Sequence, residues 1–432
     1  MVELVYAQVD NDNTLYKKVE KMLLSNDPKA LIKSIKKDIA SIRRGRKFIG
    51  YYEAFDFADK IENIVDDILL MVEDDKVASE LFKELILTDS KVYLRSDDSS
   101  GAIQMSYAKA EEGWHGCLDA LNDDEIFDDI MEMLVCEGFG VREVFSDKVP
   151  QAVLQKIYDK FYEKLKVNSN YDSFDDINVL KLCAHYMKKP KLYIKTHVFE
   201  GRTLSENDLL DYAAEYMYAE DAPMVIDTLS QVKYVDNYKA EKFYKLQIWA
   251  YEMMGQTLNV TLAYKQWYLQ SKSVDVLKSY LSRLDGEMQK QAREEALKDA
   301  QNLSFSSAIH FFYSLDEREL ASTYIWEHKN ALQTEYIYGN ELKKIANWLK
   351  ESYPQEVILL YRDSCEKSLA TSHSKYYPSA IKELKECLKI EKDSNIHSWK
   401  IEDNVMYMER LINTHKRKPK FVELFFKAFG DL

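Results

Sequence analysis

Apolar residues recur along most of the chain at the three- and four-residue intervals of a helix face. The clearest stripe comprises Leu31, Ile35, Ile39 and Ile42. Asp27–Pro28 precedes it with an N-cap acceptor and a proline for the first helical position. These positions predict an amphipathic helix that begins at residue 28.

A second stripe predicts the next helix and comprises Ala54, Ala58, Ile61, Val65, Ile68 and Val72. Arg43–Lys47 lies between the two stripes, and Gly45 is expected to end the first helix in the left-handed conformation. The cations beside it suit the negative end of the helix dipole. Two helices joined by so short a link are expected to pack as an antiparallel pair.

Helix pairs are expected to follow along the rest of the chain. Thr203–Glu206 matches a capping box before a stripe of Leu209, Leu210, Ala213 and Met217, and Met224, Val225 and Leu229 mark its partner helix. Gly255 separates two further stripes, one with Phe243, Leu246, Ala250 and Met253, the other with Leu258, Leu262 and Trp267.

A helix, a break and a second helix form the unit of tetratricopeptide-like arrays. One such hairpin cannot bury both of its faces, whereas stacked neighbours can. We therefore predict an all-α fold, an α-solenoid of stacked antiparallel helical hairpins.

A domain boundary is predicted where the helical pattern stops. Val153, Ile157, Phe161 and Leu165 form one more helix face, after which the polar segment 168–173 favours turns. The prediction is an N-terminal helical region over 1–167 and a C-terminal helical-repeat array over 174–432.

Composition excludes a many-stranded fold. The 432 residues include 12 glycines and 7 prolines, well under half the average share of about 12%, and β-sandwiches and barrels need these residues in their turns. Five well-separated cysteines and no basic-then-apolar opening segment predict a cytoplasmic protein with reduced thiols. The longest aliphatic stretch, Val357–Leu360, is far too short to cross a membrane, so no membrane association is expected.

Charge disfavours nucleic acid as a partner, because the chain carries a net charge of −14 that repels phosphates. Two clusters carry the opposite, positive charge and form candidate polar-contact patches: Arg43, Arg44, Arg46 and Lys47, and then Lys416, Arg417, Lys418 and Lys420. Each cluster is suited to phosphate contacts, and each is also typical of a solvated helix end.

No motif for nucleotide binding or catalysis is found. GxxxxGK[ST], GxGxxG, GxSxG and HExxH are all missing from the sequence, so no cofactor and no catalytic residues are predicted.

The best metal candidate combines Cys183 and His185 with His197 and Glu200. Residues 183 and 185 point to opposite sides of a helix, so ordinary helix residues are the preferred interpretation and no metal is predicted.

Three stretches carry a family resemblance: Lys29–Phe55; Leu359–Arg362 with Ser374–Tyr376 and Ala380; and Tyr407, Leu411, His415, Arg417, Lys418 and Phe421. They resemble an uncharacterised bacterial all-helical domain family found downstream of SWIM-type zinc fingers. The CxC…CxH ligand set of those fingers is missing here, and Cys183–His185 supplies only a CxH. The resemblance implies an α-helical repeat scaffold and supplies no catalytic residues.

These observations predict a non-enzymatic protein–protein interaction scaffold that binds a protein partner or a second copy of itself, in the manner of an accessory component of a bacterial stress or defence system. The alternative is a nucleic-acid-associated protein that uses Arg43–Lys47 and Lys416–Lys420. An enzyme whose site is assembled from distant helices is a third class, which a single sequence does not reveal.

Overall fold

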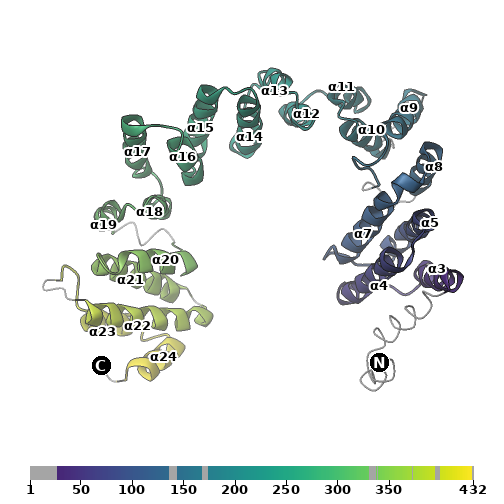
Figure 1. The fold of residues 1–432 in the computed structure, drawn as a ribbon. Coiled ribbons are helices and arrows are strands. Elements are labelled where there is room, and N and C mark those ends of the chain that lie inside the picture. Colours follow the sequence, from purple (N-terminus) through teal and green to yellow (C-terminus); the bar gives the residue numbers. More distant parts are fainter. Residues whose placement is uncertain are drawn as a thin grey trace. The chain divides into compact units, whose positions relative to one another are not determined.

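The structure is a computed structural model that describes residues 27–135, 144–167, 174–329, 337, 339–371, 373–394 and 399–430. Over these residues it consists of helices and loops without a β-strand (Figure 1), apart from one isolated bridge between Ile49 and Ser96. The all-α prediction is therefore confirmed for this part of the chain. The chain divides into two compact units, Met1–Gln256 and Thr257–Leu432.

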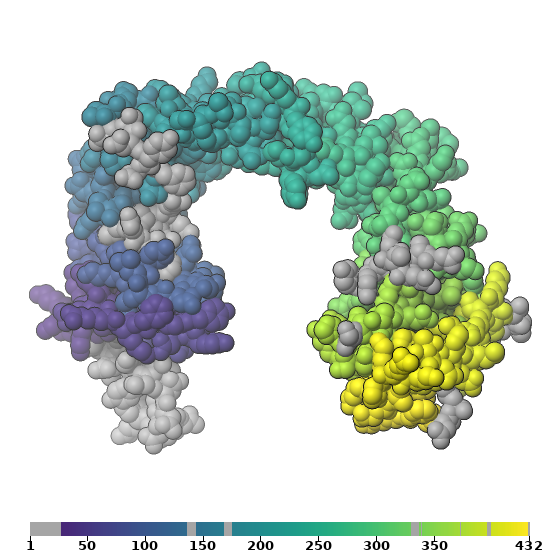
Figure 2. All heavy atoms as spheres, turned by 180° about the vertical axis from the view of Figure 1, so that it is seen from behind, coloured from purple at the N-terminus to yellow at the C-terminus, as the bar shows by residue number. Residues whose placement is uncertain are grey.

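In the first unit, helices pack mainly on helices that are close to them in sequence. α4 packs on α5 and α7, α9 on α8 and α10, and α12 on α13 and α14. The sphere view shows the same order as a gradual change of colour within the unit (Figure 2). Its helices are α3 (Pro28–Arg44), α4 (Tyr51–Met71), α5 (Asp75–Ile86), α6 (Asp89–Tyr93), α7 (Ala102–Gly116), α8 (Asp123–Met133), α9 (Gln151–Val167), α10 (Phe174–Tyr186), α11 (Pro190–Lys195), α12 (Glu206–Tyr218), α13 (Ala222–Leu229) and α14 (Asn237–Met253), with 3-10 turns at Leu118–Ala120 and Thr196–Phe199.

The predicted start of α3 is confirmed, because the Asp27 carboxylate accepts hydrogen bonds from the amides of Lys29 and Ala30. The predicted stripe on its inner face is buried as well. The expectation for Gly45 is wrong: it follows α3 with a φ of −58°, which any residue can adopt. A side chain there would require Arg95 to move, since a Cβ would lie 2.7 Å from Nη2 of Arg95.

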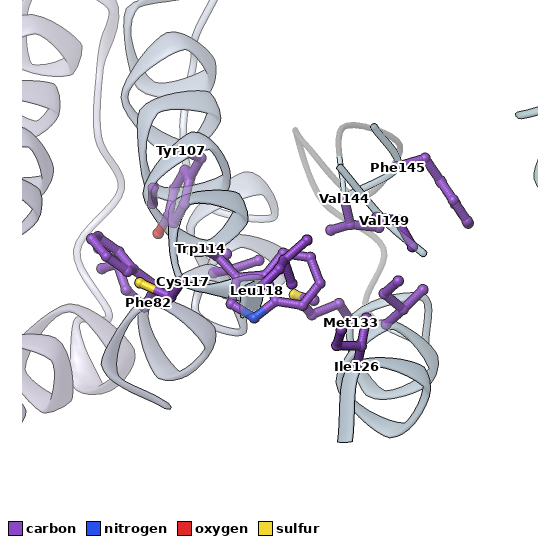
Figure 3. Packing of buried hydrophobic residues seen from close by; sticks show 14 of the residues in the cluster. Phe82, Tyr107, Trp114, Cys117, Leu118, Ile126, Met133, Val144, Phe145 and Val149 are labelled. Carbon is purple, nitrogen blue, oxygen red and sulfur yellow. The ribbon is translucent and has the colours of Figure 1, made fainter. Parts of the chain in front are cut away.

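Large aromatic side chains of the first unit's core lie on α5 and α7. Trp114 and Tyr107 of α7 and Phe82 of α5 are fully buried (Figure 3). Gly113 allows the two helices to approach, because a Cβ at this position would lie 2.5 Å from Cζ of Phe82. Tyr107 shares a 2.7 Å hydrogen bond with the Thr88 hydroxyl, so its buried polar atom is satisfied.

The predicted break at 168–173 lies outside the described residues. The helices that flank it, α9 and α10, pack on each other, and one hydrophobic core includes Leu165 before the break and Ile177 after it. The division between compact units lies further along the chain, between Gln256 and Thr257.

In the second unit, helices again contact near neighbours in sequence: α18 packs on α19 and α20, α21 on α20 and α22, and α22 on α23 and α24. Leu258 and Leu262, which the sequence assigned to an apolar stripe, are 72% and 46% exposed. The helices are α15 (Thr257–Ser271), α16 (Val274–Leu281), α17 (Gly286–Ala300), α18 (Phe305–Ser314), α19 (Arg318–Glu327), α20 (Gly339–Leu349), α21 (Pro354–Ala370), α22 (Tyr377–Asp393), α23 (Asn404–Thr414) and α24 (Pro419–Phe429), with a 3-10 turn at Ser374–Tyr376.

None of the helices in the described ranges combines the length and the apolar character needed to cross a bilayer. Cys117, Cys183, Cys365 and Cys387 are free and buried thiols, and Cys136 lies outside the described residues. The cytoplasmic location stays a prediction.

Candidate interaction site

An apolar groove of about 580 Å³ lies between α12 and α14 in the first unit. Its floor combines Ala214 and Met217 of α12 with Leu246 and Trp249 of α14. Leu246 is buried, whereas the other three side chains are partly exposed. The groove is therefore an open side of the hydrophobic cluster that holds α12, α13 and α14 together.

The rim of this groove is polar, and its charges are already paired. Lys242 forms a 2.5 Å ion pair with Asp211, and Lys245 forms a 2.6 Å ion pair with Glu241. Tyr238, at the start of α14, also lines the groove, although 97% of its surface is exposed. A large aromatic side chain held in water at the edge of an apolar groove is typical of an interaction surface.

A polar cluster fixes the start of α12. The predicted capping box at Thr203–Glu206 is wrong by two residues: the cap is Ser205, whose hydroxyl accepts from the Asp208 amide at 3.3 Å. Asp208 in turn accepts from the Ser205 amide at 2.7 Å and takes two 2.6 Å bonds from the Arg202 guanidinium. The hydrogen bonds from Arg202 lower the pKa of Asp208 well below its usual range. Asp208 is therefore the capping partner of Ser205, and its carboxylate also binds the Arg202 guanidinium.

The same cluster contains two members of the predicted metal candidate. His197, Glu200 and Asp208 each place one ligand atom within 4.8 Å of the others, a set that suits zinc chemically. However, Glu200 already contacts Lys181 at 2.5 Å and Arg202 at 2.5 Å. Two cations therefore balance the two carboxylates, and a metal ion would have to displace the guanidinium.

The other members of that candidate lie elsewhere. Cys183 is fully buried in the hydrophobic core, where burial raises the pKa of its thiol above its usual range. His185 places Nδ1 3.0 Å from the Glu215 carboxylate and stacks on Tyr218 at 3.9 Å between ring centroids. The structure therefore does not bring Cys183 and His185 together with His197 and Glu200 as one ligand set.

The first basic cluster is exposed: Arg43 and Arg44 lie in the last turn of α3, and Arg46 and Lys47 follow that helix. Arg43 donates to the Glu84 carbonyl at 3.2 Å, and Lys47 pairs with Glu53 at 2.7 Å. Arg44 and Arg46 are exposed and form no ion pair within the described part of the chain.

The second basic cluster belongs to the other unit and is partly used by the fold. Lys418 donates to the carbonyls of Leu369 and Thr371, which ties the segment before α24 to the end of α21. Lys420 pairs with Glu423 at 3.1 Å. Lys416 and Arg417 are exposed, whereas Lys418 is held by the fold.

Residues that carried the family resemblance form a buried polar cluster in the second unit. Arg362 of α21 donates to Oδ1 of Asn404 at 2.7 Å and to the Glu402 carbonyl at 2.8 Å. Tyr407 of α23 donates to the Arg362 carbonyl at 3.2 Å. These contacts join α21 to α23, so Arg362, the last residue of the stretch Leu359–Arg362, has a structural role.

Two partly buried carboxyl groups lie beside this cluster. Burial raises the pKa of Glu383 to about 7 and that of Asp363 to about 6. Ser364 donates to one Glu383 oxygen at 3.0 Å, while the other oxygen has no hydrogen-bond partner within the described residues. Asp363 is paired with Lys367 at 2.7 Å. Sequence reasoning missed both groups, because helix-face spacing alone does not show that a charged residue is buried.

The chain matches a model of a family of unknown function (DUF6880) over residues 1–172 and 214–424. It therefore belongs to this family, and the expected membership of an uncharacterised family is confirmed. The association with SWIM-type zinc fingers and the likeness to tetratricopeptide repeats stay predictions. None of the curated proteins matches the chain.

Proposed function

We propose that this member of the family is a non-enzymatic protein–protein interaction scaffold, an α-solenoid whose groove between α12 and α14 binds an amphipathic helix of a partner protein. The single observation that carries the proposal is the open apolar groove itself. Packing between helices that are neighbours in sequence, seen in both units, supports the solenoid because stacked hairpins make such contacts.

The chemistry of the groove favours a helix as its occupant. Helix α14 lines it from Tyr238 to Trp249, and the last part of α12 adds Ala214 and Met217. An amphipathic helix laid into such a groove inserts apolar side chains at three- and four-residue intervals. Trp249 supplies a large aromatic anchor of the kind that dominates binding energy at interfaces. Met217 supplies an adaptable contact.

The charges at the rim define the partner further. Lys242 and Lys245 are each paired with a carboxylate of the same chain, so neither adds an unbalanced positive charge to the rim. We therefore expect an occupant with an apolar face flanked by charges of both signs. The ion-pair network around Arg202 supports a structural role for the ionisable groups near the groove, since it caps α12 and holds it in place.

Affinity capture with matched variants tests this proposal. Ala214→Glu places a charge on the groove floor, Tyr238→Glu removes the exposed ring, and Tyr234→Glu changes a tyrosine that is 68% exposed and does not line the groove. The wild type and Tyr234→Glu are expected to retain the same partner, and both groove variants are expected to lose it while keeping the wild-type melting temperature.

Two outcomes contradict the proposal. Equal retention by all four proteins would place the interaction elsewhere. A dimer of the isolated protein in sedimentation experiments that Ala214→Glu dissociates would show that the groove binds a second copy of this chain instead of a partner helix.

A further inference from the structure

A second exposed surface lies at the corner between α3 and α4, away from the groove residues in sequence. It consists of the basic cluster together with four aromatic residues that follow it: Arg43, Arg44, Arg46, Lys47, Phe48, Tyr51, Tyr52 and Phe55. We call it the basic–aromatic corner. We infer that it binds single-stranded nucleic acid, with arginines on the phosphates and aromatic rings stacked on the bases.

The loop that carries this corner is held in one conformation. Arg95 donates to the Lys47 carbonyl at 2.9 Å and to the Ile42 carbonyl at 3.2 Å. Ile49 is buried, and its amide and carbonyl bond to Arg95 and Asp97, each at 2.8 Å. Because these bonds hold the backbone of the loop before a ligand arrives, the entropic cost of binding is lowered.

The aromatic side chains of the corner are turned to water instead of the core. Tyr52 is 86% exposed and Phe48 is 60% exposed, and Tyr51 and Phe55 are also exposed. The ring centroid of Tyr51 lies 5.2 Å from that of Tyr52 and 6.1 Å from that of Phe55, in edge-to-face contacts. Three neighbouring, partly exposed rings are costly for a surface with no ligand, and their exposed faces can each stack on a base.

The charges that precede these rings in the sequence are suited to phosphate. Arg44 and Arg46 are exposed and make no ion pair within the described residues, so their guanidinium groups are free to bind phosphate oxygens. Lys47 is paired with Glu53, yet 83% of its side chain is exposed. Exposed pairs of this kind contribute little energy, so Lys47 can exchange Glu53 for a phosphate.

Rings and cations together favour a single strand over other polyanions. A duplex hides the faces of its bases, so it offers phosphates to the arginines and nothing to the rings. An acidic protein segment likewise uses only the cations. The net charge of −14 repels any polyanion at long range, and we therefore expect a local contact whose affinity falls steeply with salt.

Fluorescence anisotropy with the full chain tests the inference. The probes are labelled 20-nucleotide oligo-dT and oligo-U, a 20-base-pair duplex, and polyglutamate of similar length. We expect the single strands to bind at low salt more tightly than the other two. Tyr52→Ala is expected to lower single-strand affinity between about 5-fold and about 150-fold, the range measured for one stacked base. Because Tyr52 is so exposed, this change does not threaten folding.

The charge test uses a matched pair of double variants. Arg44→Ala/Arg46→Ala is expected to reduce the slope of log affinity against log salt by about 1.4, the value for two lost contacts to a single strand. Lys416→Ala/Arg417→Ala removes the same charge from the other unit and is expected to leave binding unchanged.

The inference is wrong if single strands do not bind at low salt, if Tyr52→Ala binds like the wild type, or if the two double variants weaken binding equally. Polyglutamate bound as tightly as oligo-dT would assign the corner to acidic protein segments. If the groove proposal fails, this result is unaffected, because the two tests change different residues.

Discussion

The guanidinium carbon of Arg362 lies 4.2 Å from the ring centroid of Tyr407, which places a buried cation against an aromatic face between α21 and α23. Because the same guanidinium also donates to Asn404 and to the Glu402 carbonyl, removing it leaves these two acceptors without this donor. The pair therefore joins the two helices by a cation–π contact and by hydrogen bonds.

Arg362→Ala is expected to destabilise the second unit by about 3 kcal/mol, the magnitude typical of a buried hydrogen-bonded charge that is removed. Arg362→Lys should recover little of this, since an ammonium group cannot reproduce the planar fork. Urea unfolding followed by circular dichroism measures both. Arg410→Ala is the control, because Arg410 also lies 5.1 Å from the Tyr407 centroid but is exposed. A control that is as damaging as Arg362→Ala would contradict the assigned role.

Gly113→Ala is expected to destabilise the first unit by about 1–3 kcal/mol, because the new Cβ would meet the buried Phe82 ring at 2.5 Å and force α5 and α7 apart. Gly116→Ala in the same helix meets no atom within 4 Å, so it should be neutral or slightly stabilising. Thermal melting of the two variants beside the wild type is the measurement. Equal melting temperatures would show that α7 does not approach α5 as closely as described.

Stability of the second unit should fall as pH rises from about 4.5 to about 7. Burial raises the pKa of Glu383 to about 7, so in this range the unfolded chain has lost a proton that the folded chain retains, and ionisation favours unfolding. Asp363, with its pKa raised to about 6, acts in the same direction.

Glu383→Gln keeps the shape of the side chain and removes its charge. It is expected to stabilise the protein at pH 8 by up to about 3 kcal/mol and to have little effect at pH 4.5. Urea unfolding of both proteins across this pH range gives the comparison. If the difference between them does not change with pH, Glu383 is not a buried acid in the folded state.

Zinc should leave the melting temperature of the wild type unchanged, because Arg202 already occupies the space between Glu200 and Asp208. Arg202→Ala is expected to melt at a lower temperature in the absence of metal, and added Zn²⁺ should raise its melting temperature by binding the freed ligands. His197→Ala/Arg202→Ala should lose that response. A rise in the wild type that His197→Ala abolishes would show that the cluster is a metal site in the native protein.

The sequence allowed the local parts of this fold to be predicted. The start of α3 depends on Asp27 and its own stripe of apolar residues, and such signals lie within a few positions of one another. The conformation at Gly45 could not be predicted, because Arg95, which crowds it, is 50 residues further along the chain. The cap of α12 was misplaced because Thr203 and Ser205 are equivalent as single residues, and each is followed three positions later by an acidic residue, Glu206 or Asp208.

The candidate sites were likewise predictable in part from the sequence. The basic residues 43–47 could be found as a run, whereas the exposure of Tyr52 beside them follows from how α4 packs. The groove could not be predicted, since Met217 and Leu246 both fit the pattern of an ordinary helix core. Only the three-dimensional packing of α12 against α14 shows that Met217 is part of an open surface while Leu246 is buried.

The most direct test of the scaffold proposal is site-specific photo-cross-linking in the native cell, with benzoylphenylalanine introduced at Tyr238 or at Tyr234. The proposal predicts a defined adduct from position 238, mapped by mass spectrometry to an amphipathic helix of another protein, and a much weaker one from position 234. Equal adducts from both positions, or none from position 238, would contradict it.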